Sequence, residues 1–368
     1  MTIAVHTDSH ITAIANSVWK GIFHGLFKQY PNHRFVFLSS VKDFEDLPLM
    51  PNVVVPSNFL TTSIPILKKW RQKMQIVGLL EQYAADIFIT TDISLNLDTS
   101  IRQVLMLSDA EVVRIARATR GLPASKPRVR SALAKTDRII VNSNYSSGLL
   151  QEAFSIEAGK ITVSGLPAEP YFSPLTWDEK EAVKEKYTAG KEYFLFHGPV
   201  SPGNNIITLL KAFSFFKKRQ LSNLQLVLAG PVLWPSGAFE EKLATYRYRN
   251  DVIVLENLDE MEAIKLVAAS YSCISPCHDT GFSLFQLSSI CCGVPMISCS
   301  VDAEPDAPNV VKSGISPENL AEQMKLLYKD EHLRSRLMEL ALAEKSKYQP
   351  ETIADHVWNA IKGDGSDS

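Results

Sequence analysis

Short apolar runs alternate with longer amphipathic stretches along most of the chain. In the first half, the pattern of residues 14–29 predicts a helix that stands between two apolar runs, TIAVHT and HRFVFLSS. The runs ADIFITT, RQVLMLSDA, DRIIVNSN and KITVSG follow, with further helix-like segments among them. Strands that alternate with helices in this way predict a parallel sheet made of βαβ units.

Residues 173–190 interrupt the alternation, because they are charged, contain Pro174 and end in Gly190. We interpret them as a short helix in an interdomain connection. The alternation then restarts with YFLFHG and continues through LQLVLAG, DVIVLEN, SCIS and VPMISC, each followed by a helical pattern. The chain is therefore predicted to be an α/β protein with two doubly wound, Rossmann-like domains, residues 1–172 and 191–348. We expect the ligand site beyond the carboxyl ends of the strands, in a cleft between the domains.

Composition argues against several functional classes. The chain has 368 residues, 21% of them charged, and a net charge of −2 with both signs spread along it, so we expect no nucleic-acid partner. There is no apolar run of about 18 residues, and the opening MTIAVHTDSH does not have the pattern of a signal peptide. Both observations favour a cytoplasmic protein. The glycine motifs of dinucleotide-binding and P-loop proteins are absent, which argues against dehydrogenases and kinases.

The five cysteines all fall between Cys273 and Cys299. Their number is odd, and none of them forms the pair with a two-residue spacing that is typical of zinc sites. We interpret them as reduced structural thiols and expect no metal site; a metal site is the less favoured alternative.

The second half resembles the donor-binding domain of retaining glycosyltransferases of family 4, also called group 1, which have the two-Rossmann GT-B architecture. The resemblance begins at YFLFHGPVSPGNNIITLLKAFSFFKKR and is most specific over residues 258–301, LDEMEAIKLVAASYSCISPCHDTGFSLFQLSSICCGVPMISCSV. The first half resembles the family more loosely, through IRQVLMLSDAE and ALAKTDRIIVNSNYSSGLL. The resemblance implies two domains facing across a cleft. It also implies that residues 349–368 form a helix that crosses back to the first domain, followed by a polar tail.

The chain departs from the family at the donor motif. The family has two glutamates eight positions apart around a Gly-Phe turn, where this chain has Thr280 and Ser288. The family also has an arginine and a lysine that neutralise the diphosphate, where this chain has Gly203 and Asn204, whereas Asn205 fits the pattern. We therefore describe the donor motif as degenerate.

Carried over position by position, the resemblance implies catalytic positions at Asp109 and Thr280. Asp109 follows Ser108 where the family usually has a His-Asp pair, and a helix N-cap is the other interpretation of Asp109. The positions implied for donor binding are Gly198, Gly203, Asn204, Asn205, Asp279, Gly281, Phe282, Ser283 and Ser288.

The missing charges matter because negative charge grows on the departing diphosphate during glycosyl transfer. Hydrogen bonds to charged groups contribute roughly 1.5–3 kcal/mol each, and losing about four would cost on the order of 5 kcal/mol or more. A micromolar ligand is held by only about 8 kcal/mol. Some residues could compensate for the missing donor-site charges, and others could bind the acceptor. For each of them, the alternative is an ordinary structural role in a loop or in the core. They are Asp279, His197 and His278 for the donor, with Gln286 as a poor substitute, and His6, Asp8 and His10 for the acceptor.

Two functions remain open from the sequence. The first is a retaining, metal-independent glycosyltransferase with no cofactor, acting on a nucleoside diphosphate sugar donor and a saccharide or glycoconjugate acceptor. The second is a catalytically inactive homologue that serves as a binding module or as the partner of an active glycosyltransferase in polysaccharide biosynthesis. Peripheral membrane association and a partner glycosyltransferase are open alternatives among the expected partners.

Overall fold

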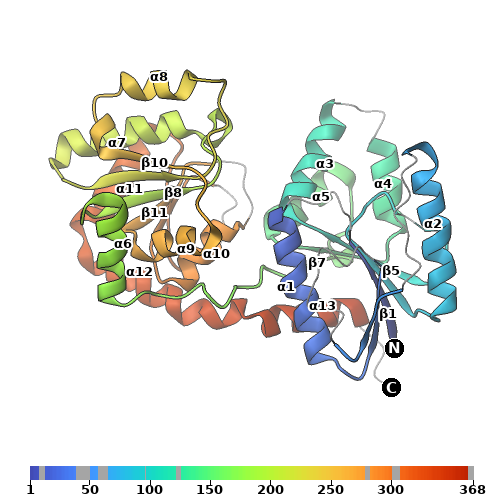
Figure 1. The fold of residues 1–368 in the computed structure, drawn as a ribbon. Helices are drawn as coiled ribbons and strands as arrows, with labels where there is room; N and C mark the ends of the chain where they lie inside the picture. Colours follow the sequence, from blue (N-terminus) through green and yellow to red (C-terminus); the bar gives the residue numbers. More distant parts are fainter. Residues whose placement is uncertain are drawn as a thin grey trace. The chain divides into compact units, whose positions relative to one another are not determined.

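The chain divides into two compact units, Met1–Pro167 together with Gln349–Ser368, and Ala168–Tyr348 (Figure 1). The computed structural model describes the backbone of residues 1–7, 13–38, 50–56, 65–95, 97–121, 126–277, 282–300 and 307–363. Within these ranges no helix combines the length and the apolar character that a bilayer span requires. Each unit contains one parallel sheet and is described here by itself.

The first unit is built on a parallel sheet with the strand order β3-β2-β1-β4-β5-β6-β7. Its strands are β1 (Thr2–His6), β2 (Arg34–Phe37), β3 (Val53–Val54), β4 (Ile87–Thr90), β5 (Arg102–Leu107), β6 (Arg138–Val141) and β7 (Ile161–Val163). The order reverses between β1 and β4, as in a doubly wound domain. The first sheet therefore has one topological switch point, at the carboxyl ends of these two strands.

Helices cover both faces of this sheet. They are α1 (Ala13–Gln29), α2 (Pro65–Gln82), α3 (Asp109–Gly121), α4 (Lys126–Lys135), α5 (Asn144–Phe154), the 3-10 helix η4 (Ala158–Lys160) and α13 (Pro350–Lys362). Phe35 and Phe37 of β2 pack against Phe27 of α1, whereas Val36 between them shares a core with Ile76 of α2. Because successive side chains of a strand point to opposite faces, α1 and α2 lie on opposite sides of the sheet.

The last helix, α13, belongs to the first unit and packs on α1. The Trp358 ring stacks on Tyr30 at a centroid distance of 4.0 Å, and the Tyr30 hydroxyl donates a 2.6 Å hydrogen bond to Asp355. Burial and this carboxylate raise the pKa of Tyr30. A Cβ added at Gly25 would lie 3.1 Å from the Ala354 side chain, so the glycine permits the close approach of the two helices. Residues distant in sequence thus complete one core.

The second unit is built on a parallel sheet with the order β10-β9-β8-β11-β12-β13. Its strands are β8 (Tyr193–His197), β9 (Gln225–Ala229), β10 (Val252–Leu255), β11 (Ser272–Ser275), β12 (Met296–Ser298) and β13 (Val310–Lys312). Its α-helices are α6 (Trp177–Thr188), α7 (Ile206–Gln220), α8 (Ala238–Ala244), α9 (Glu260–Ala269), α10 (Leu284–Cys291), α11 (Pro317–Lys329) and α12 (Glu331–Glu344). Its 3-10 helices are η5 (Pro202–Asn204), η6 (Arg249–Asp251) and η7 (Lys345–Tyr348).

Neighbouring residues of β8 show which helices lie on which face of this sheet. Phe194 packs in one core with Phe213 of α7 and Met324 of α11. The adjacent Tyr193 points the other way, and its hydroxyl donates a 2.7 Å hydrogen bond to the carbonyl of Leu266 in α9. The helices α7 and α11 therefore lie on one face and α9 on the other.

The segment predicted as an interdomain connection contains α6, which is part of the second unit. The boundary between the units lies at Pro167 and Ala168, earlier than the predicted residue 172. Lys186 and Tyr187 of α6 donate hydrogen bonds to Glu262 of α9 and hold the pKa of that carboxyl at about 2. These contacts anchor α6, so the charges of this segment stabilise a packed helix.

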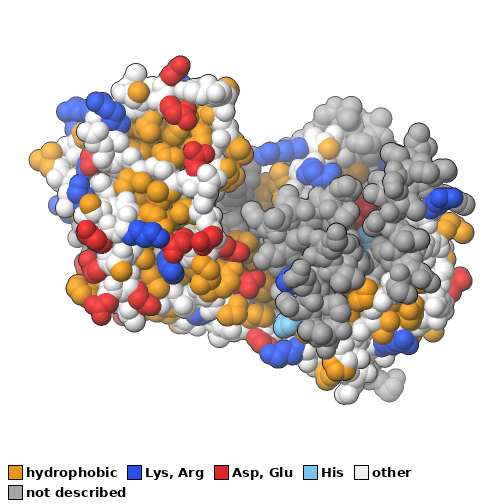
Figure 2. All heavy atoms as spheres, in the orientation of Figure 1, with side chains coloured by type: hydrophobic (Ala, Val, Ile, Leu, Met, Phe, Trp, Pro, Cys, Tyr) orange, Lys and Arg blue, Asp and Glu red, His pale blue; other side chains and the backbone are white. Residues whose placement is uncertain are grey.

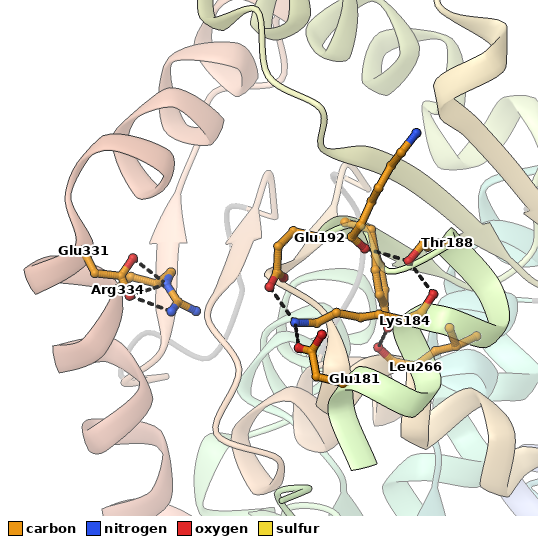
Figure 3. A network of polar contacts seen from close by, with 9 residues as sticks. Glu181, Lys184, Thr188, Glu192, Leu266, Glu331 and Arg334 are labelled. Atoms are coloured by element: carbon orange, nitrogen blue, oxygen red, sulfur yellow. Dashed lines mark hydrogen bonds and ion pairs between the residues drawn. The ribbon is translucent and has the colours of Figure 1, made fainter. Parts of the chain in front are cut away.

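A second group of contacts fixes α6 to the start of β8 (Figure 3). The ammonium of Lys184 donates to Glu181 at 2.8 Å and to Glu192 at 2.5 Å, and the Thr188 hydroxyl donates to the carbonyl of Lys184 at 2.9 Å. Because Glu192 directly precedes β8, the network sets where that strand begins. It is structural and lies at the opposite end of the strand from the loop discussed below.

We expect Trp358→Ala to destabilise the first unit by about 3–5 kcal/mol, because it removes a buried ring and leaves a cavity between α13 and α1. Hydrogen exchange of the α1 amides should be faster in this variant. The matched control is Asn359→Ala, which changes an exposed side chain of the same helix. Equal protection of α1 in parent and Trp358→Ala would contradict this description of the core.

Candidate functional site

The second sheet has its topological switch point between β8 and β11. The chain leaves β8 toward α7 on one face, and it leaves β11 toward α10, which packs against α9 on the other face. Where the connections of two adjacent parallel strands diverge, their loops leave a crevice that is the usual ligand site of such sheets. The two loops here are residues 198–205 and the segment that leads into α10.

The first loop is shaped by two glycines at the ends of adjacent strands. Gly198 follows β8 with φ 147°, and Gly230 follows β9 with φ 138°. A Cβ added at Gly230 would lie only 2.3 Å from the Gly198 carbonyl oxygen, so no side chain fits there. The amides of Gly198 and Val200 donate 2.9 Å hydrogen bonds to Ala229 and Pro231. The backbone of the loop is therefore held against the end of β9.

The rest of the loop forms η5 and leads into α7. The side-chain amide of Asn204 donates a 2.6 Å hydrogen bond to the Pro199 carbonyl within the loop. Asn205 has φ 54°, and its side chain donates a 3.0 Å hydrogen bond to the Pro276 carbonyl just beyond β11. Gly203 is exposed, and the nearest atom to an added Cβ would be 3.9 Å away. The structure thus brings the predicted loop positions together beside the end of β11.

The second loop ends at Ser283, whose side chain caps α10 by accepting a hydrogen bond from the Gln286 amide at 3.2 Å. Phe282 is buried and stacks on the Tyr348 ring at 5.4 Å. This capped helix start offers backbone N–H groups and the positive end of a helix dipole. The predicted positions Asp279, Thr280 and Gly281, and the candidate compensator His278, lie outside the described residues.

Ser288, predicted at the donor site, lies instead in the interior of the unit. It is 0% exposed, and its hydroxyl donates a 2.8 Å hydrogen bond to the Phe285 carbonyl within α10. Its place on the inward side of the helix leaves the side chain closed to a ligand in this structure. Nearly every residue of α10 is buried, so the apolar pattern of LFQLSSIC gave no indication of which side faces the core.

The loops bear no charge in the described residues. Residues 198–205 and 282–292 contain no Asp, Glu, Lys or Arg. His197, a candidate cation, is half-buried with its ring edge-on to Phe285 at 5.7 Å. Burial lowers the pKa of His197, which favours the neutral imidazole near pH 7. A diphosphate at these loops would therefore meet backbone N–H groups and neutral side chains.

Asp109 lies at the carboxyl edge of the first sheet and joins two helices. Its Oδ1 accepts hydrogen bonds from the hydroxyls of Ser143 at 2.8 Å and Ser146 at 2.6 Å, at the start of α5. The N-cap of α3 is Ser108, which exchanges hydrogen bonds with Glu111, so Asp109 is the first residue of the helix and not its cap. This geometry suits a group that positions α3 against α5.

A buried histidine marks the switch point of the first sheet. His6 at the end of β1 is 3% exposed, with Nδ1 3.3 Å from the Thr90 hydroxyl of β4. Its Nε2 lies 3.1 Å from the side-chain nitrogen of Gln72 in α2. Because an amide nitrogen only donates, His6 Nε2 accepts and Nδ1 bears the proton. The sequence pointed to His6 but not to Gln72 or Thr90, and the candidates Asp8 and His10 lie outside the described residues.

The five cysteines are free and buried. Burial raises the pKa of Cys277 and of Cys291 to about 11 and that of Cys292 to about 12. Thiols in this range are protonated at neutral pH and are poor nucleophiles and metal ligands. Over the described part of the chain, no cluster of His, Cys, Asp and Glu could hold a metal ion.

Part of the chain is similar in sequence to known proteins. Residues 178–343 match the family described as Glycosyl transferases group 1. The O-antigen chain mannosyltransferase B of Escherichia coli is 24% identical over 179 residues, which are 48% of this chain and 47% of that protein. The match thus spans about half the length of this relative.

Solved structures share the fold along almost the whole chain. Anabaena Alr3699/HepE in complex with UDP superposes with a TM-score of 0.76 and 15% identity, covering 98% of this chain and 100% of that one. A glycosyltransferase from Rickettsia africae superposes with a TM-score of 0.73 and 13% identity, covering 98% of each chain. Residues 178–343 therefore resemble the group 1 glycosyl transferases in sequence, and the chain has the fold of GT-B glycosyltransferase structures, with two Rossmann-like domains.

Proposed function

We propose that this protein transfers a sugar from a nucleoside diphosphate sugar to a saccharide or glycoconjugate acceptor, with retention and without a metal ion. The observation that carries the proposal is the switch point of the second sheet. There the hydrogen bond from Asn205 to Pro276 joins the glycine loop to the end of β11. The UDP in the Anabaena structure and the mannosyltransferase activity named for the Escherichia coli relative support a donor of this class.

The donor is held in this proposal mainly by backbone groups. The capped start of α10 supplies N–H groups and a positive dipole end, which suit a phosphate. Gly198 and Gly230 carry no side chain, so a diphosphate can lie close to their backbone. Thr280 remains the proposed position nearest the donor sugar. With no Lys or Arg on either loop, we propose weak donor binding and slow turnover.

An inactive homologue that serves as a binding module or as the partner of an active glycosyltransferase is the second candidate. The observation that favours it is the absence of Lys and Arg from both loops, together with the burial of Ser288. A protein that does not catalyse glycosyl transfer does not need cations that stabilise a departing diphosphate. The two candidates differ in whether nucleotide binding can be detected and strengthened.

The location of the site is tested by a pair of glycine substitutions. Gly230→Ala should lower the affinity for UDP by tenfold or more, because the added Cβ forces the Gly198 carbonyl away. Gly148→Ala, at an exposed position of α5 in the first unit, is the matched control, since nothing lies within 4 Å of its added Cβ and its φ is ordinary. Ligand-observed NMR titration gives the affinities, and thermal unfolding confirms that both variants fold. If Gly230→Ala and the parent bind UDP with equal affinity, the nucleotide does not bind beside Gly198 and Gly230.

The electrostatic account is tested by adding the charges that are missing. Gly203→Arg with Asn204→Lys should tighten UDP binding by about tenfold or more, since each hydrogen bond from a cation contributes roughly 1.5–3 kcal/mol. The control is Asn223→Arg with Asn250→Lys, two exposed positions that precede β9 and β10 at the opposite edge of the sheet. If the site variant gains no more than the control, the loops do not face the diphosphate. If no protein binds any nucleotide, the inactive homologue is favoured.

A further inference from the structure

The chain passes between its two units twice, at Pro167–Ala168 and at Tyr348–Gln349. On the side of the second unit the two crossings are joined, because the Ala168 amide donates a 2.7 Å hydrogen bond to the Tyr348 carbonyl. Ala168 is buried and Tyr348 is half-buried. We call these two residues, with the hydrogen bond between them, the junction. The junction belongs wholly to the second unit and ties together segments that are far apart in sequence.

The side chain of Tyr348 connects the junction to the proposed nucleotide site. Its ring stacks on that of Phe282, with the ring centroids 5.4 Å apart and the ring planes at 22°. Phe282 is only 3% exposed, and it directly precedes Ser283, whose side chain caps α10. Because Phe282 and Ser283 are consecutive, the stack helps to fix where α10 begins. It thereby also fixes the direction of the N–H groups at the start of this helix.

The other end of α10 is attached to segments that lead to the same junction. The helix ends at its C-cap residue Cys292, whose thiol takes part in a hydrogen bond with the backbone of Ser173, shortly after the first crossing. Gly293 follows with φ 67°, and a Cβ added there would lie 2.9 Å from Leu342 of α12. The helix α12 leads through η7 to Tyr348. Both ends of α10 are therefore held by residues near the two crossings.

The contacts between α10 and these segments are made by rings, backbone groups and a buried thiol. None of these groups is charged. The Lys, Arg, Asp and Glu side chains of the second unit are instead scattered over its surface, as Figure 2 shows for one face. Salt should therefore not weaken the link between the junction and α10. The stacked ring of Tyr348 is the part of this link that a substitution can remove by itself.

We propose that Tyr348 is a positioning residue of the nucleotide site, whose ring holds Phe282 in the place that makes the start of α10 fit a phosphate. Because a coupling between two sites is reciprocal, a phosphate bound at α10 should in turn stabilise the stack and the junction. Nucleotide binding is thereby linked to the stability of the chain where it passes between the units. This inference rests on the proposed function, since it takes the start of α10 as the phosphate site.

The test compares two variants of the same residue. Tyr348→Leu removes the ring but keeps the carbonyl of the junction, whereas Tyr348→Phe keeps both. In ligand-observed NMR titration, the affinity for UDP should fall about two- to tenfold in Tyr348→Leu, as expected for the loss of one ring contact, and stay unchanged in Tyr348→Phe. Hydrogen exchange is the second readout. At equal fractions bound, UDP should slow exchange of the Ala168 amide in the parent and in Tyr348→Phe but not in Tyr348→Leu.

Tyr328→Leu is the matched control. Tyr328 is also half-buried, and its ring also lies 5.4 Å from a buried phenylalanine ring, that of Phe216 in α7. It should match the parent in both measurements, and thermal unfolding verifies that all variants fold. The positioning role is overturned if Tyr348→Leu binds UDP as the parent does, if Tyr328→Leu loses as much affinity, or if UDP protects Ala168 equally without the ring. If the parent binds no nucleotide, the proposed function fails, and the positioning role fails with it.

Discussion

One side-chain hydrogen bond determines the geometry on which the proposed site depends. Asn205 sits in the left-handed region, which asparagine tolerates better than most residues, and it donates to the Pro276 carbonyl at 3.0 Å. The same residue ends η5 and accepts the first hydrogen bond of α7, from the Leu209 amide. A single position therefore fixes the glycine loop, the start of α7 and the end of β11 relative to one another.

The distribution of charge follows a consistent pattern within each unit. In the second unit, the charged side chains that form contacts, such as Lys184 and Glu262, fix α6 to β8 and α9, away from the glycine loop. The loop itself is neutral, and burial keeps His197 neutral as well. In the first unit, residues 112–135, which include most of α3 and all of α4, contain seven Lys and Arg and no Asp or Glu. In the described residues, none of the charged side chains lies on the two loops of the proposed site.

Much of the fold was predictable because local pattern and final packing agree. The helical pattern predicted after YFLFHG forms α7, and the apolar runs form the central strands. Some elements were missed for identifiable reasons. The strands β3 and β13, two and three residues long, are too short to show a pattern. The helical pattern predicted after VPMISC is divided into α11 and α12 by Asp330, whose side chain caps the second helix.

The site was less predictable because its key contacts join residues distant in sequence. The approach of Gly230 to Gly198 and the bond from Asn205 to Pro276 leave no trace in local composition. The burial of Ser288 could not be predicted from the sequence pattern, because α10 is buried on nearly all sides and has no polar face. The net charge of the whole chain, −2, also does not reveal that residues 112–135 contain seven Lys and Arg and no Asp or Glu.

The central claim is that the nucleotide site is formed by backbone and lacks cations. Calorimetric titration of the parent with UDP-, GDP- and ADP-sugars at two salt concentrations tests this claim directly. Starting from about 8 kcal/mol for a micromolar ligand, a loss of about 5 kcal/mol predicts dissociation constants in the millimolar range or weaker. The values should change little between about 50 and 300 mM salt, because no ion pair is there to be screened. A low-micromolar dissociation constant that rises steeply with salt would contradict the account.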